Sequence, residues 1–183
     1  SKSAEKIDLK GLVAIPGIVD MKAFVGEPGF EYKENFRTLS QAALAGGVTS
    51  IVTMPNTKPI IDNVSMVDFI IRRGRDKAKV NLFPCASITR QREGNQMTEF
   101  GLLKARGIIG FSDVNKTIQN SELMSRIMNY ASDIDVLIMQ HVEDYELAKN
   151  SCINQGEVAT RLGLQGVSDI ALSLIHISEP TRP

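Results

Sequence analysis

The sequence predicts an α/β fold built on a parallel sheet. Short apolar runs alternate with longer amphipathic segments along most of the chain. The runs are rich in β-branched residues and almost continuously apolar, as are strands buried on both faces. Alternating strands and helices indicate crossover connections, which make neighbouring strands parallel. The runs are Leu12–Ala23, Ser50–Met54, Val80–Cys85, Gly107–Phe111 and Val136–Met139.

The segments between the runs carry helix signals. Their apolar residues recur at helical spacing, and glycines mark several of their ends. In the last segment, Leu123, Met124, Ile127 and Met128 form a stripe that we expect to face the core, with Asn120 or Ser121 as the N-cap. The predicted helices cover Asn35–Ala45, Val64–Lys79, Met97–Ala105 and Ser121–Ser132.

The number of strand–helix units sets the expected architecture. Only about five βα units are visible in the 183 residues, whereas a complete (β/α)₈ barrel takes roughly 250 residues. We therefore expect an incomplete (β/α)₈ TIM barrel that holds about the first five βα units.

The composition is that of an ordinary globular protein. The chain is 43% hydrophobic and 23% charged, and its net charge is zero, which favours neither nucleic acid nor an anionic membrane as a partner. No apolar run approaches the roughly 18 residues of a membrane span. Cys85 and Cys152 form no disulfide framework and no metal-ligand spacing, and the first ten residues lack the apolar core of a signal peptide. We therefore expect a cytoplasmic protein.

The segment from Val19 to Glu34 carries the most specific pattern. Side chains alternate along a strand, so we expect Asp20, Lys22 and Phe24 to share one face. In a barrel, the inward face at the carboxyl end of a strand is where catalytic groups sit. A chemical role for this segment would therefore depend on these side chains.

This segment resembles the first metal-binding strand of the dihydroorotases, amidohydrolases of pyrimidine synthesis, which reads D-x-H-x-H-x-R-E-P-G. The match retains Asp20 and the run from residue 27 to residue 34. Lys22 and Phe24 stand where the family has its two histidines, and Gly26 stands where it has its arginine. A lysine repels a divalent cation, phenylalanine has no donor atom, and glycine cannot hold a carboxylate in a bidentate pair.

A second motif follows the second predicted strand. Residues 53–57, Thr-Met-Pro-Asn-Thr, resemble the family's M-P-N-T segment, in which the asparagine hydrogen-bonds the substrate carboxylate. The resemblance therefore implies a substrate-binding role for Asn56. The sequence Pro-Asn-Thr also favours a turn, so the alternative is that Asn56 is only a turn residue.

Two further motifs resemble the metal-binding loops of the family. Residues 111–115 fall where many dihydroorotases have F-S-D-D-G, and the metal-binding carboxylate position is then Val114, with Asp113 beside it. Residues 140–144 match S-H-C-E-D and place His141 at a metal-ligand position. The alternatives are a loop or capping role for Asp113 and a structural role for His141. A last match, to N-E-G-E-V-S-T-R-L-G, covers Asn154–Gly163.

The resemblance implies a function and also implies that residues needed for it are missing. Intact family members use zinc to activate a water that opens the ring amide of dihydroorotate, and the reverse reaction cyclises N-carbamoyl-aspartate. With the H-x-H pair replaced, we expect a non-catalytic pseudoenzyme that binds no zinc and serves as a structural partner of aspartate carbamoyltransferase or as a homo-oligomer. The alternative is an active cyclic amidohydrolase of which this chain is a fragment lacking the rest of the site.

If no metal ion is bound, the carboxylates near the expected site need another positive charge. Asp20, Asp113 and His141 are expected to converge at the mouth of the barrel, where unpaired carboxylates would resist burial. Lys22 could neutralise one of them, preferably Asp113, or it could extend into solvent.

The expected domain organisation has three parts. Residues 1–12 form the end of an N-terminal flanking segment, and residues 13–172 form the partial barrel. Residues 173–183 fit no pattern of the family and read like translated adapter sequence, so this tail, with His176, is excluded from the fold.

Overall fold

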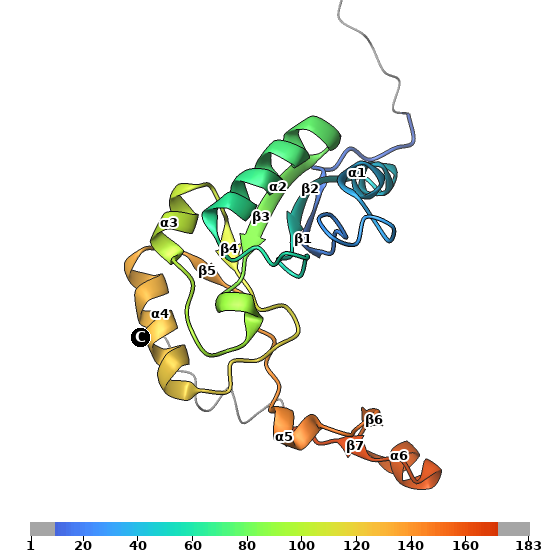
Figure 1. The fold of residues 1–183 in the computed structure, drawn as a ribbon. Helices are drawn as coiled ribbons and strands as arrows, with labels where there is room; N and C mark the ends of the chain where they lie inside the picture. The colour runs from blue at the N-terminus through green and yellow to red at the C-terminus, as the bar shows by residue number, and fades with distance from the viewer. Residues whose placement is uncertain (1–9, 172–183) are drawn as a thin grey trace, which may run out of the picture.

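The computed structural model describes residues 10–171. Its centre is a five-stranded sheet of β1 (Ile18–Ala23), β2 (Val48–Thr53), β3 (Asn81–Ala86), β4 (Gly110–Phe111) and β5 (Leu137–Ile138). All neighbouring strands pair in parallel, and the spatial order follows the sequence. The sheet curls into part of a barrel (Figure 1). The predicted parallel α/β sheet and partial barrel are confirmed.

Four helices follow the first four strands: α1 (Phe36–Ala45), α2 (Val64–Lys77), α3 (Phe100–Ala105) and α4 (Ser121–Asp133), with a short 3₁₀ turn, η1 (Arg90–Arg92), before α3. Asparagine side chains cap three of them. Asn35 and Thr38 form a capping box at α1, and Asn63 caps α2. Of the two candidates at α4, Asn120 is the cap, because its side chain accepts the N–H of Leu123 at 3.0 Å.

A small excursion follows β5. It consists of α5 (Tyr145–Ala148), β6 (Ile153–Asn154), α6 (Glu157–Leu162) and β7 (Gly166–Val167), with β6 and β7 paired in parallel. It projects away from the five-stranded sheet (Figure 1). Its strands have two residues each, which is too short to leave a periodic hydrophobic signal in the sequence. None of the helices in the described part of the chain is long and apolar enough to cross a membrane.

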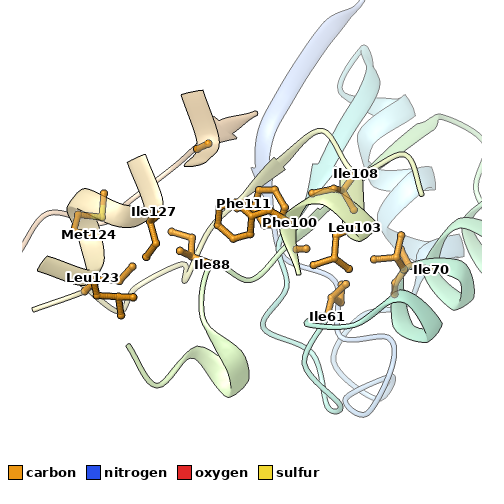
Figure 2. Packing of buried hydrophobic residues seen from close by; sticks show 14 of the residues in the cluster. Ile61, Ile70, Ile88, Phe100, Leu103, Ile108, Phe111, Leu123, Met124 and Ile127 are labelled. Carbon is orange, nitrogen blue, oxygen red and sulfur yellow. The ribbon is translucent and has the colours of Figure 1, made fainter. Parts of the chain in front are cut away.

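Two apolar clusters lie on opposite faces of the sheet, because Cys85 and Ala86, neighbours on one strand, belong to different clusters. The larger cluster lies between the sheet and the helices, where Phe100 of α3 and Phe111 of β4 stack with ring centroids 3.8 Å apart (Figure 2). The predicted α4 stripe contributes to it, with Ile127 fully buried. The smaller cluster lies on the inner face and comprises Val52, Met54, Cys85, Val114 and Met139.

The first strand departs from regular geometry. Its register against β2 shifts between Asp20 and Ala23, and the N–H of Lys22 is bonded to the side chain of Asp20 at 3.0 Å. This bulge interrupts the strict alternation of side chains that the sequence predicts for the strand. Every β1 residue before Ala23 is exposed, which is unusual for a parallel sheet.

A buried carboxylate fixes the loop after β1. Glu27 is 4% exposed, accepts the N–H of Phe36 at 3.2 Å and forms an ion pair with Arg73 of α2. The hydrogen bond and charge of Glu27 raise the pKa of the Arg73 guanidinium. One side chain therefore joins this loop to the first turn of α1 and to α2.

We predict that Glu27→Gln lowers the free energy of unfolding by about 1.5–3 kcal/mol, the range for hydrogen bonds to charged groups. The amide keeps the volume but loses the charge of a buried acceptor. Glu99→Gln is the matched control, because Glu99 is exposed and makes a surface pair with Arg90 at 3.3 Å. Denaturant titration of both variants is the measurement, and equal effects would contradict the prediction.

We also predict that the 183-residue chain associates or aggregates through the open edges of its sheet. β1 and β5 are the two edge strands, and Val19 and Met21 of β1 are more than half exposed. Sedimentation velocity over a range of concentrations should show association that high salt does not weaken. A monomer with a sharp cooperative melt would contradict this expectation.

Candidate functional site

The candidate site lies at the carboxyl ends of the strands, where the loops after β1, β2, β4 and β5 carry the residues singled out in the sequence. The barrel geometry places these ends at one mouth.

The β1 residues do not form the expected charge arrangement. Lys22 and Asp20 are exposed, and Phe24 is 49% exposed. None of the ion pairs within residues 10–171 includes Lys22. The expected pairing of Lys22 with Asp113 or Asp20 is therefore wrong. The bulge explains part of this result, because Asp20 bonds the backbone of its own strand instead.

Gly26 occupies a position that has no room for a side chain. A Cβ atom there would lie 2.2 Å from the carbonyl oxygen of Phe30 and 2.7 Å from that of Glu34. The loop folds back on itself, and the N–H of Phe30 donates to the Gly26 carbonyl at 2.6 Å. An arginine at this position would require the loop to move.

The loops after β1 and β2 lie against each other. The N–H of Lys58 donates to the Pro28 carbonyl at 3.0 Å, and a Cβ on Gly29, whose φ is +98°, would meet the Lys58 carbonyl at 2.2 Å. Asn56 lies in the second of these loops, half-buried, and its Oδ1 atom is buried without a hydrogen-bond partner in the structure. Such an atom is a free acceptor that faces no protein donor.

Asp113 is turned towards the loop after β3. Its carboxylate accepts the N–H groups of Ile88 at 2.9 Å and Thr89 at 3.1 Å, and also the Thr89 hydroxyl. The Arg92 guanidinium donates to the Asp113 carbonyl at 2.9 Å. Burial raises the pKa of the Asp113 carboxyl, while these hydrogen bonds and the charge of Arg92 act in the opposite direction. Asp113 thus holds a loop in place.

Val114 has an unusual backbone conformation. Its φ is 64°, in the left-handed region that β-branched residues rarely adopt, and its side chain is 3% exposed. It packs in the inner apolar cluster, whose other members include Met54 and Met139. Burial also raises the pKa of the Cys85 thiol in this cluster, so Cys85 is held as a neutral thiol there.

His141 lines a cavity of about 360 Å³ formed by the loops after β3, β4 and β5. Its Nε2 atom is 2.7 Å from the carboxylate of Glu143, and its carbonyl accepts the hydroxyl of Thr117 at 2.7 Å. The hydroxyl of Thr117 in turn accepts the N–H of Glu143 at 3.1 Å. The His141 imidazole thus already has a partner within its own loop. Hydrogen bonds through Thr117 join this loop to the loop after β4.

The donor set does not fit a metal ion. Across residues 10–171, no three His, Cys, Asp or Glu side chains lie together in a way that could hold one, whereas catalytic zinc takes about three protein ligands. The structure also gives roles to residues that the sequence did not single out, namely Glu27, Arg73, Thr89 and Arg92. Only Glu27 carried a sequence signal, as part of the matched run that ends at Glu34.

Comparisons with known proteins agree with this geometry. The profile of the family described as "Dihydro-orotase-like" matches residues 11–179. A dihydroorotase of Syntrophus aciditrophicus is 44% identical over 165 residues, which are 90% of this chain and 39% of that protein. A dihydroorotase of Trichlorobacter lovleyi is 40% identical over 171 residues, 93% of this chain and 40% of that protein. The chain thus spans about two fifths of the length of these relatives.

A solved structure shows the same fold. The L-hydantoinase (dihydropyrimidinase) of Arthrobacter aurescens superposes with a TM-score of 0.61 at 19% identity, covering 73% of this chain and 31% of the hydantoinase. From the length of the family match and the identity of the relatives, this chain belongs to the dihydroorotase-like family.

Proposed function

We propose that the chain belongs to a non-catalytic member of this family that binds no zinc. The observation that supports the proposal is Val114. It lies at the position of the family's metal-binding carboxylate, and its side chain completes an apolar cluster on the inner face of the barrel. A divalent cation in apolar surroundings would lose its hydration without gaining donors.

The other ligand positions support the same proposal. Lys22 is exposed and cationic, Phe24 offers no donor, and His141 is paired with Glu143. The loops at this point are held by the buried carboxylates of Glu27 and Asp113, which accept backbone N–H groups. Residues that elsewhere would bind a metal can therefore change without loss of the loops that surround them.

The proposed role is structural, as a partner of aspartate carbamoyltransferase or as a homo-oligomer, in the cytoplasm, where Cys85 and Cys152 would stay reduced. A second candidate is an active dihydroorotase whose remaining site residues come from outside this chain. The unpartnered Oδ1 of Asn56 and the cavity beside His141 favour this candidate, since both could receive a polar substrate.

We predict that the protein holds well below one zinc per chain after purification without a histidine tag. No set of three donors is available among the described residues. Elemental analysis of dialysed protein is the measurement, with His141→Ala as the companion variant. One tightly held zinc per chain that disappears in His141→Ala would overturn the proposal.

We also predict no measurable hydrolysis of dihydroorotate and no cyclisation of N-carbamoyl-aspartate. Without a metal-activated water, the free acceptor of Asn56 cannot supply the nucleophile. Restoring Lys22→His, Phe24→His and Val114→Asp together should still give no activity, and adding Gly26→Arg should destabilise the loop, because the Phe30 carbonyl fills that space. Activity that His141→Ala abolishes would favour the second candidate.

A further inference from the structure

The cavity beside His141 offers a binding site separate from the substrate position of the motif. The loops after β3, β4 and β5 line it, and Asn56, which the resemblance assigns to substrate binding, is not among the lining residues. Its volume of about 360 Å³ falls within the range of small-molecule sites, about 300–1,000 Å³. The cavity is therefore large enough for a ligand of its own.

Two of the three carboxylates that line the cavity are already bonded within the protein. Glu143 lies 2.7 Å from Nε2 of His141. The carboxylate of Asp113 accepts three hydrogen bonds from the loop after β3. The third carboxylate, Glu93, is exposed, and no ion pair within residues 10–171 includes it. Glu93 is therefore the one lining carboxylate, among the described residues, that is not engaged.

The two cations that line the cavity, Arg92 and Lys116, belong to none of the ion pairs within residues 10–171. Arg92 is half-buried, and its Nε and Nη2 atoms donate to the Asp113 carbonyl at 3.1 and 2.9 Å. Nη2 also donates to the side chain of Asn115 at 2.6 Å, whereas Nη1 donates to no acceptor among the described residues. Burial lowers the pKa of the Arg92 guanidinium, and the charge of Asp113 acts in the opposite direction. An anion beside this partly desolvated cation would therefore be stabilised.

We propose that this cavity binds the oxyanion group of a small molecule, a carboxylate or a phosphate, with Arg92 and Lys116 as its cationic contacts. A guanidinium presents N–H groups that suit carboxylate and phosphate oxygens, and an ammonium adds three further donors on a flexible stem. The Asp113 carbonyl and Asn115 hold the guanidinium in place before a ligand arrives, which lowers the cost of binding. No metal ion takes part, so the inference is independent of whether the chain is catalytic.

Isothermal titration calorimetry of the 183-residue chain with inorganic phosphate, and separately with malonate, tests the proposal. Sodium chloride at the same ionic strength is the reference for both titrations. At least one of the two oxyanions should bind with a Kd of about 1 mM or tighter, and chloride should not. Binding of phosphate alone would assign the site to a phosphate group, and binding of malonate alone would assign it to a carboxylate. If neither binds, the proposal is wrong.

Substitutions in the cavity then locate the bound oxyanion. Lys116→Gln should weaken binding about fivefold, because it removes one exposed charge. Arg92→Lys should weaken it about tenfold, since a lysine cannot hold the Asp113 carbonyl and an oxyanion in one fixed geometry. Glu93→Gln should strengthen binding about twofold, because it removes a charge of the same sign as the ligand. Lys77→Gln is the matched control, because Lys77 is exposed, lies outside the cavity and belongs to no ion pair within the described residues.

Thermal melts of every variant check the fold. Lys116 and Glu93 are exposed, so their variants keep the test decisive if Arg92→Lys loosens the loop after β3. Unchanged affinity in Lys116→Gln, or equal losses in Lys116→Gln and Lys77→Gln, would mean that the oxyanion binds elsewhere and would contradict the proposal. Zinc content and dihydroorotate hydrolysis are separate measurements, so failure of this proposal is distinguishable from failure of the proposed function.

Discussion

The loops at the mouth of the partial barrel depend on buried carboxylates that are satisfied by backbone N–H groups. Glu27 accepts the first N–H of α1 and pairs with Arg73, and Asp113 accepts two successive N–H groups after β3. A carboxylate removed from water is costly unless such donors are in place. Each of these side chains therefore fixes the loop that donates to it.

The contacts that position the loops are thus distinct from the side chains at the metal-ligand positions of the motif. The close approach of Gly29 to Lys58 and the bond from the Lys58 N–H to the Pro28 carbonyl bring two loops together at backbone level, independent of the side chains at positions 22 and 24. The inner apolar cluster includes Val114, which stands at the position that the resemblance assigns to a metal-binding carboxylate.

Much of the fold was predictable from the sequence, because the spacing of apolar residues and the composition can be read within each segment on its own. Each of the five apolar runs overlaps a strand, and the four predicted helices are present with ends that differ by a few residues. The bulge in β1 was not predictable, since it depends on the pairing with β2, and it changed the expected environment of Lys22. The partners of Glu27 and Asp113 were also hidden, because Arg73 and Thr89 are 46 and 24 residues away in sequence. The motifs identified Asn56, Val114 and His141 as candidate site residues. The residues that surround each of them could be seen only in the structure.

The left-handed backbone of Val114 has a consequence for how this position can change. Aspartate and asparagine enter that region several-fold more readily than other residues, whereas a β-branched side chain is strained there. The backbone would therefore accept aspartate more easily than it accepts valine, whereas the apolar neighbours would oppose burial of the carboxylate. Backbone conformation and side-chain environment therefore favour different residues at position 114, because the left-handed φ suits aspartate and the packing against Met54 and Met139 suits valine.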